Sequence, residues 1–181
     1  FYENIFKLEP GTNLIINNNF EFKFKKFWRP KIFESSFSEK KINNIISNNL
    51  NKSISEICKS NLKIGLSLSG GVDSNLLLSF MRQKLGKKNI TTYSIIDNDP
   101  RYDESELINY SAKIYGVRNR KIILDPKENH FENLNKLIQY HDKPISTINY
   151  FLQSYIYKTM AKDNIKISIN GNGADEMFAG Y

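Results

Sequence analysis

From Lys63 onward, short runs of β-branched and apolar residues alternate with amphipathic segments of ten or more residues. Such alternation produces strand–helix–strand units, which build parallel sheets covered by helices. We therefore predict an α/β fold with a doubly wound, mostly parallel sheet and helices on both faces. The expected strands are residues 63–68, 90–96, 120–124 and 166–169, and the expected helices are residues 74–85, 103–115, 131–141 and 147–161.

The N-terminal residues have a different pattern. Two β-rich runs, Asn13–Ile16 and Phe20–Phe24, flank the turn-prone Asn17–Asn19 and predict a β-hairpin. Pro10-Gly11 is a further turn signal. Because an isolated hairpin has marginal stability, we interpret this one as the remnant of a larger N-terminal domain.

A helix is predicted between the hairpin and the first strand of the sheet. Ser36 and Glu39 form a capping-box pattern, and apolar residues recur at helical spacing to about Lys59. Cys58 lies in this helix, where we interpret it as a small buried apolar side chain. The apolar positions are Ile42, Ile45, Ile46, Leu50, Ile54 and Ile57.

Composition narrows the class of protein. The chain has 181 residues, is 40% hydrophobic and 25% charged, and so is typical of a globular protein. A single cysteine excludes an internal disulfide framework, and no uncharged apolar run reaches the ~18–20 residues of a membrane span. The chain opens on Phe1 without a signal-peptide pattern, so we expect a cytoplasmic protein with no membrane partner.

The net charge of +7 raises the question of a nucleic-acid partner. The first 66 residues hold 11 basic and 6 acidic side chains, and the rest hold 15 and 13. Lysine outnumbers arginine 21 to 5, a bias that AT-rich codons produce. We interpret the excess as compositional drift and expect no nucleic-acid partner, with such binding kept as the minority alternative.

The first motif, Ser69–Ser74, lies between a predicted strand and a predicted helix. Gly70 and Gly71 let the backbone turn sharply and approach a ligand, and the unpaired N–H groups of the helix start attract anions. Asp73 suits a phosphate site only if a cation lies between the two, and Mg²⁺ binds both carboxylate and phosphate oxygens. The alternative is a plain strand–turn–helix in which Asp73 or Ser74 caps the helix.

The second motif follows the last predicted strand and spans residues 170–181. Gly171 and Gly173 allow a tight loop, and Asp175 and Glu176 open a helix whose dipole favours acidic residues. The alternative is that both acids only stabilise the start of the helix.

Sheet topology relates the two motifs. Ligands of doubly wound sheets bind beyond the carboxyl ends of the strands, at the switch point of the strand order. If strand 166–169 lies beside strand 63–68, on the side away from strand 90–96, both loops face one crevice. Asp73 and Asp175 could then share one Mg²⁺ ion on a pyrophosphate group.

These motifs carry a resemblance to a known family. Ser69–Ser74 resembles the pyrophosphate-binding PP-loop of the ATP pyrophosphatases, a Rossmann-like superfamily. In combination with residues 170–181, it resembles the glutamine-hydrolysing asparagine synthetases. Three further stretches agree: Phe1–Gly11 resembles the end of the glutaminase domain of the family, Tyr93–Ile95 its second synthetase strand, and Tyr102–Ser105 the start of the next helix.

The resemblance implies a two-part organisation and a reaction. Residues 1–30 would be the tail of a glutaminase domain, and residues 31–181 the first part of a synthetase domain. The reaction would be ATP-dependent amidation of aspartate through β-aspartyl-AMP, with ammonia derived from glutamine. The partners would be these small molecules and the upstream glutaminase domain, and a homodimer stays open.

The resemblance also assigns ligands and site residues, with ATP and Mg²⁺ as the cofactors. The β- and γ-phosphates would be held by Ser69, Gly70, Gly71, Asp73 and Ser74; the nucleoside would be lined by Leu68, Ile95, Asn170 and Gly171; Mg²⁺ would be ligated by Asp73 and Asp175. Catalytic contacts to the acceptor, and a lysine near the adenylate, would lie beyond Tyr181. We therefore expect an internal piece that does not complete the reaction alone.

Two positions depart from the pattern of the family. Asn170 replaces a usual serine, and Asn172 replaces a usual acid on the acceptor side of the crevice. The second departure keeps other functions open. One alternative is a related amidotransferase or β-lactam-type synthetase that acts on another carboxylate, and others are a tRNA-modifying PP-loop enzyme and a degenerate ATP-binding regulator.

Overall fold

The computed structural model describes residues 2–31, 36–60, 62–86, 89–178 and 180. The chain divides into two compact units, residues 1–42 and residues 43–181. The elements in chain order are β1 Thr12–Ile16, β2 Phe22–Lys26, α1 Glu39–Ile57, β3 Ile64–Ser67, α2 Val72–Leu85, β4 Ile90–Ile96, α3 Ser105–Tyr115, β5 Arg118–Ile123, α4 His130–His141, α5 Ile148–Lys162, β6 Ile167–Ile169 and α6 Ala174–Phe178.

The first unit contains the predicted hairpin, in which β1 pairs antiparallel with β2. The expected second strand was wrong at its start, because Phe20 has a φ of 59° and lies in the turn. Asn17 explains the turn, since its Oδ1 accepts from the backbone N–H groups of Asn19 and Glu21 at 3.0 and 2.9 Å. The apolar side chains of the hairpin are exposed in this structure, among them Phe22, Phe24 and Trp28.

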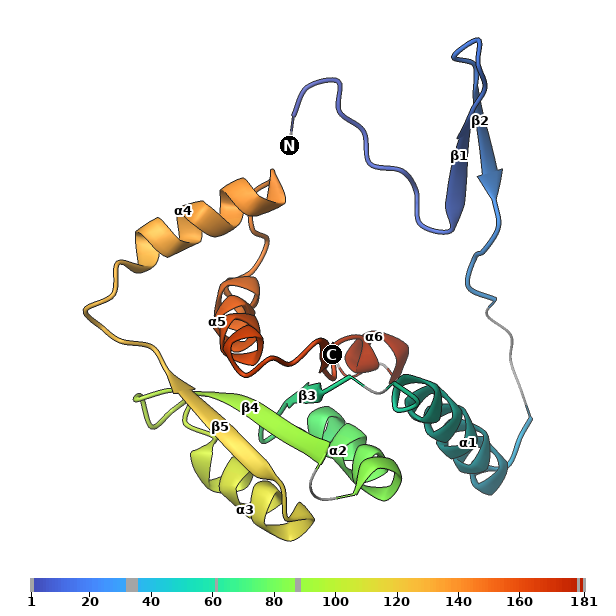
Figure 1. Cartoon of the computed structure of the whole chain (residues 1–181). Coiled ribbons are helices and arrows are strands. Elements are labelled where there is room, and N and C mark those ends of the chain that lie inside the picture. The colour runs from blue at the N-terminus through green and yellow to red at the C-terminus, as the bar shows by residue number, and fades with distance from the viewer. Residues whose placement is uncertain (1, 32–35, 61, 87–88, 179, 181) are drawn as a thin grey trace. The chain divides into compact units, whose positions relative to one another are not determined.

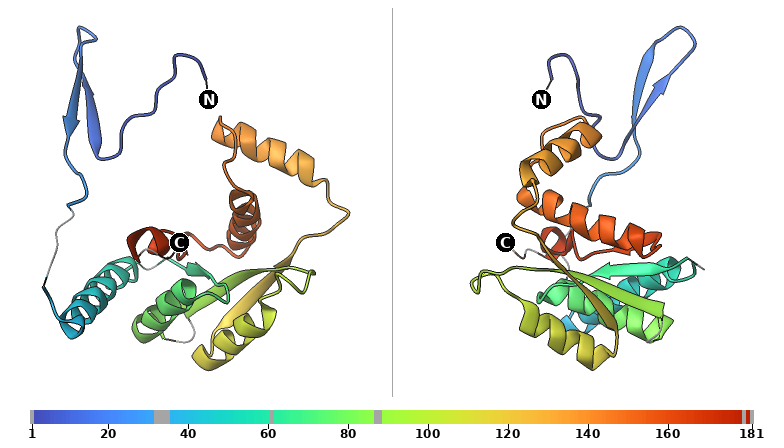
Figure 2. Two further views of the ribbon diagram at one scale, coloured as in Figure 1. Left: turned by 180° about the vertical axis from the view of Figure 1, so that it is seen from behind. Right: turned by 60° about the vertical axis from the view of Figure 1, so that its left-hand side comes forward.

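The second unit contains the predicted α/β sheet. Its four strands are all parallel in the order β5-β4-β3-β6, so β6 lies beside β3 on the side away from β4, which is the condition under which both motif loops face one crevice. Helices α2 and α3 cover one face of this sheet and α5 covers the other (Figure 1; Figure 2). None of the helices in the described part of the chain is long and apolar enough to cross a membrane.

The core has one cluster on each face of the sheet. On the α2 and α3 face, Leu66, Leu78 and Ile108 are at most 1% exposed. On the α5 face, Tyr93 packs with Ile156 and Met160. The central strand β3 is buried from Ile64 to Leu66, in keeping with its position between β4 and β6.

The helix before β3 differs from the prediction at both ends. It begins at Glu39, and the Ser38 carbonyl accepts from the N–H of Ile42 at 3.0 Å, so the expected capping box at Ser36 is wrong. Of the predicted apolar stripe, only Ile54 is fully buried. Cys58 lies just beyond α1 and packs partly buried against the core, and this burial raises the pKa of its thiol.

A polar cluster on the α5 face of the sheet holds the carboxyl end of α5. The Tyr93 hydroxyl donates to Asp163 Oδ2 at 2.9 Å, and Arg120 Nε lies 3.2 Å from the same oxygen. Burial, with a smaller contribution from the hydrogen bond to Asp163, raises the pKa of Tyr93 from 10.0 to about 12. This cluster fastens the loop after α5 to β4 and β5.

The raised pKa of Tyr93 predicts a loss of stability at alkaline pH. Since the folded pKa exceeds the unfolded one, the contribution is complete below pH ~10 and is lost as the pH rises toward about 12. We expect the free energy of unfolding of the wild type to fall by roughly 2 kcal/mol more than that of Tyr93→Phe over this range. Urea titrations at several pH values measure it, and parallel pH profiles for the two proteins would contradict the prediction.

Candidate functional site

Two hollows lie at opposite ends of the parallel sheet. The larger, of ≈ 750 Å³, opens at the carboxyl ends of the strands, where it is lined by Leu68 after β3, Ile95 in β4 and Asn170 after β6. This is the edge at which doubly wound sheets bind their ligands, and β3 beside β6 is the point where the strand order reverses. Both sequence motifs therefore open into the larger hollow, which we call the cleft.

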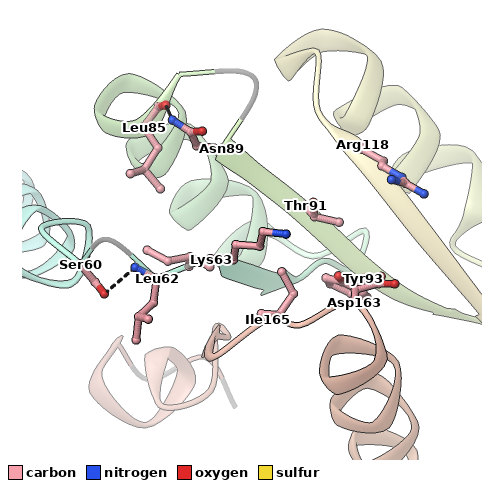
Figure 3. A pocket seen from close by; sticks show the side chains of 11 residues that line it. Ser60, Leu62, Lys63, Leu85, Asn89, Thr91, Tyr93, Arg118, Asp163 and Ile165 are labelled. Atoms are coloured by element: carbon pink, nitrogen blue, oxygen red, sulfur yellow. Dashed lines mark hydrogen bonds between the residues drawn. The ribbon is translucent and has the colours of Figure 1, made fainter.

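The second hollow, of ≈ 550 Å³, lies at the amino ends of the strands (Figure 3). Lys63, Thr91 and Arg118, which lie at the starts of β3, β4 and β5, line it together with Tyr93 and Asp163. It contains neither motif, and its Tyr93–Asp163 pair serves the anchoring of α5. We therefore assign the candidate site to the cleft.

The first loop, residues 69–74, is organised by its own hydroxyl groups. Ser74 is buried, and its Oγ lies 3.0 Å from Ser69 Oγ and accepts from the Ser69 N–H at 3.1 Å. Asn75 Nδ2 donates to the Gly71 carbonyl at 2.7 Å and closes the turn from the helix side. Ser74, which sequence reasoning assigned to phosphate binding, thus also holds the loop in shape.

The neighbouring strand fixes the point at which the first loop begins. Ser94 Oγ donates to the Leu68 carbonyl at 2.7 Å, and the Leu68 N–H donates to the Tyr93 carbonyl at 2.8 Å. Asn119 Nδ2 donates in turn to Ser94 Oγ at 2.8 Å. Sequence reasoning missed this series of hydrogen bonds, because no local pattern marks Ser94 or Asn119 as a partner of the loop.

The second loop, residues 170–173, is a tight turn that leads into α6. Asn170 Oδ1 accepts from the Asn172 N–H at 3.1 Å, so the residue that departs from the family pattern caps its own loop. Gly173 has a φ of 97°, which glycine adopts without strain. Asp175 and Glu176 follow in the first turn of α6. Two residues of the motif, Ala179 and Tyr181, lie outside the described residues.

The two loops touch, because β6 pairs with β3. A Cβ atom added to Gly171 would lie 2.9 Å from Asp73 Cβ and 3.3 Å from the backbone nitrogen of Ser74. Only a residue without a side chain fits this contact. Residues that are about 100 positions apart in the chain therefore meet, and Asp73 and Asp175 line the same cleft.

Most of the sequence-predicted site residues line the cleft, although Gly70 and Gly71 do not contribute to its surface. The cleft also has a wall that sequence reasoning missed, formed by the segment before α5 and by the first turns of that helix. The predicted residues that line it are Leu68, Ser69, Asp73, Ser74, Ile95, Asn170, Gly171 and Asp175, and the missed ones include Glu104, Ser146, Thr147, Asn149, Tyr150 and Gln153.

The charged side chains that line the cleft in the described part of the chain are all acidic. Its acidic lining residues are Asp73, Glu104, Asp175 and Glu176, and no lysine, arginine or histidine lines it within the described part of the chain. A polyphosphate placed here would meet like charge unless a cation came with it. Carboxylate oxygens are the donors that Mg²⁺ prefers, so the residues fit a metal–phosphate ligand better than a free anion.

The sequence of this chain is similar to those of known proteins. The family model of asparagine synthase matches residues 46–181. Asparagine synthetase (glutamine-hydrolyzing) 1 of Bacillus subtilis is 24% identical, with 97% of this chain and 27% of that protein covered. Amidase chyE of Penicillium rubens is 25% identical over the whole chain and 29% of its own length. The chain thus spans less than a third of these two relatives.

A solved structure with the same fold supports the topology. It is the NH3-dependent NAD synthetase of Campylobacter jejuni, with a TM-score of 0.50 and 20% identity over 76% of this chain and 60% of that one. At this identity the likeness concerns the fold alone. With the family model covering the whole α/β sheet and both glycine loops, the chain belongs to the asparagine synthase family.

Proposed function

We propose that the chain is the nucleotide-binding part of an ATP-dependent ligase that activates a carboxylate and transfers ammonia to it. A carboxylate oxygen of the acceptor attacks the α-phosphorus of ATP, the bond to the β-phosphate breaks, and pyrophosphate leaves. Ammonia then displaces AMP from the acyl carbon and loses a proton. The observation that carries this proposal is the convergence of two glycine loops, each with an aspartate, on one acidic cleft at the switch point of the sheet.

The residues of the cleft suggest a role for each loop. In the proposal, the first loop holds the β- and γ-phosphates, while Leu68, Ile95 and the start of the second loop line the nucleoside. Asp73 and Asp175 would hold Mg²⁺, which offsets the charge that develops on the departing pyrophosphate. The apolar Leu68 and Ile95 suit a base and a sugar edge, and the Asn170 amide offers both a donor and an acceptor.

Aspartate is the acceptor that the family resemblance favours, with asparagine as the product and glutamine as the ammonia source. In this proposal the hairpin of residues 1–30 belongs to a glutaminase domain and residues 31–181 to the synthetase domain. The exposed Phe22 and Phe24 support this division, because a two-stranded hairpin with apolar side chains needs a neighbouring surface.

A second acceptor is supported by one residue and one relative. Asn172 is exposed at the rim of the cleft, where the family pattern has an acid. The amidase chyE, whose name is not that of an asparagine synthetase, is 25% identical over the whole chain. An enzyme of the same chemistry with another carboxylate as its acceptor is therefore the alternative proposal.

Pyrophosphate release by the full-length protein tests the function directly. ATP, Mg²⁺ and ammonia are supplied with or without aspartate, and the products are identified by mass spectrometry. We expect release that depends on aspartate and forms asparagine and AMP. Release that depends on a different carboxylate would support the alternative acceptor, and ATP binding without any release would contradict a ligase.

The metal proposal predicts the effect of two charge-removing variants. Asp73→Asn and Asp175→Asn should each lower pyrophosphate release by about 100-fold and raise the Mg²⁺ concentration needed for half-maximal rate. Asp142→Asn is the matched control, since Asp142 is exposed after α4 and has a φ of 51° that asparagine tolerates. Unchanged Mg²⁺ dependence in both site variants would remove these residues as ligands.

The contact between the loops predicts the effect of one methyl group. Gly171→Ala should push the second loop away from Asp73 and weaken ATP binding by roughly tenfold or more. Gly86→Ala is the control, because Gly86 has a φ of 71° but open space around its Cα. It should lower the free energy of unfolding by about 1 kcal/mol and leave ATP affinity unchanged. Equal affinities in both variants would contradict the role of the contact.

A further inference from the structure

One donor of the first loop is taken by an acidic side chain from another element. The Gly70 N–H donates to Glu104 Oε2 at 2.9 Å, across 34 residues of the chain. The neighbouring loop donors stay within the loop, since the Gly71 N–H donates to Ser69 Oγ. An amide of a glycine loop that opens a helix is a group that binds phosphate, and here a carboxylate occupies it.

The side chain of Glu104 does not cap its own helix. It precedes α3 as the N-cap residue, yet its side chain makes no capping hydrogen bond. At the start of α3, the Asp103 carboxylate accepts hydrogen bonds from the N–H and the hydroxyl of Ser105 at 2.9 and 2.8 Å. The Glu104 side chain is thus available for a role toward the loop.

The position of Glu104 allows it both to reach the loop and to leave it. A Cβ atom added to Gly70 would lie 3.4 Å from Glu104 Cβ and 2.9 Å from Leu107 Cδ1, so the loop packs closely on the start of α3. Glu104 itself is exposed and lines the cleft beside Asp73. Its carboxylate can therefore swing into solvent without opening the core.

We infer that Glu104 is an internal competitor for the phosphate position on the Gly70 amide, and that it selects for metal-loaded nucleotide. The inference rests on the proposed function, because it concerns ATP in the same cleft. One N–H cannot serve a carboxylate and a phosphate at once, so an incoming phosphate must displace Glu104. A metal-free triphosphate carries more negative charge than its Mg²⁺ complex, and it meets stronger repulsion from this carboxylate in a cleft without basic residues among those described.

The test compares nucleotide binding by Glu104→Gln and Glu104→Ala with binding by the wild-type full-length protein. Calorimetry is performed with Mg-ATP, with ATP in chelator, and with inorganic pyrophosphate. We expect both variants to bind metal-free ATP and pyrophosphate about tenfold tighter, with a much smaller gain for Mg-ATP. Glu106→Gln is the matched control, since Glu106 is exposed on the same helix and does not line the cleft.

A structural readout tests the hydrogen bond to Gly70 itself, and the direction of the affinity change separates competition from support of the loop. In nucleotide-free protein, the amide resonance of Gly70 should move in Glu104→Ala and stay in place in Glu106→Gln. If Glu104 instead holds the loop in its binding shape, Glu104→Gln and Glu104→Ala both lose affinity for all three ligands, and the inference is overturned. Equal gains in the Glu106 control would overturn it as well, because they would show an effect of net charge alone.

The proposed function can fail independently of this inference. If the wild type binds none of the three ligands, ATP chemistry in the cleft is contradicted. In that case, pyrophosphate binding gained by Glu104→Ala alone would still support competition at the Gly70 amide. An absence of binding in every variant would reject both.

Discussion

The backbone contact between Gly171 and Asp73 is the constraint on which the site depends. It joins the loop after β6 to the start of α2, so the two strands that precede these loops must be neighbours with the same direction. On the other side of β3, the bond from Ser94 to the Leu68 carbonyl holds the exit of the strand. The first loop thus starts from a fixed point between β4 and β6, and its own hydroxyl groups determine the rest of its shape.

The acidic lining of the cleft determines which kind of ligand this geometry favours. The backbone N–H groups of a glycine loop at a helix start attract phosphate, while Asp73, Glu104 and Asp175 repel it. Both effects favour a ligand whose negative charge is already reduced by a bound cation. The proposed ligase chemistry and the proposed role of Glu104 follow from this balance, and neither depends on the identity of the acceptor.

Much of the sheet could be predicted from the sequence, because β-rich runs that alternate with helices longer than ten residues leave strong local patterns. β4 has its predicted bounds, whereas the placement of β6 beside β3 was only a condition of the sequence argument, which the structure meets. Errors occurred where local signals compete. Phe20 has a residue type typical of strands but lies in the turn, and Glu39 begins α1 instead of closing a capping box. The hydrogen bond between Gly70 and Glu104 could not be predicted, because no local pattern indicates which distant carboxylate accepts from an exposed amide.

Residue type and local spacing were sufficient to predict the alternation of strands and helices, the two glycine loops, and the aspartate associated with each loop. These properties depend on residue type and spacing within a few turns of chain, where propensity and periodicity act. Tertiary structure alone decided the contact of Gly171 with Asp73, the chain from Asn119 through Ser94 to Leu68, and the wall contributed by α5. Each of these requires side chains or backbone from segments far apart in the sequence, and only the packing of the strands in a specific order brings such groups within bonding distance.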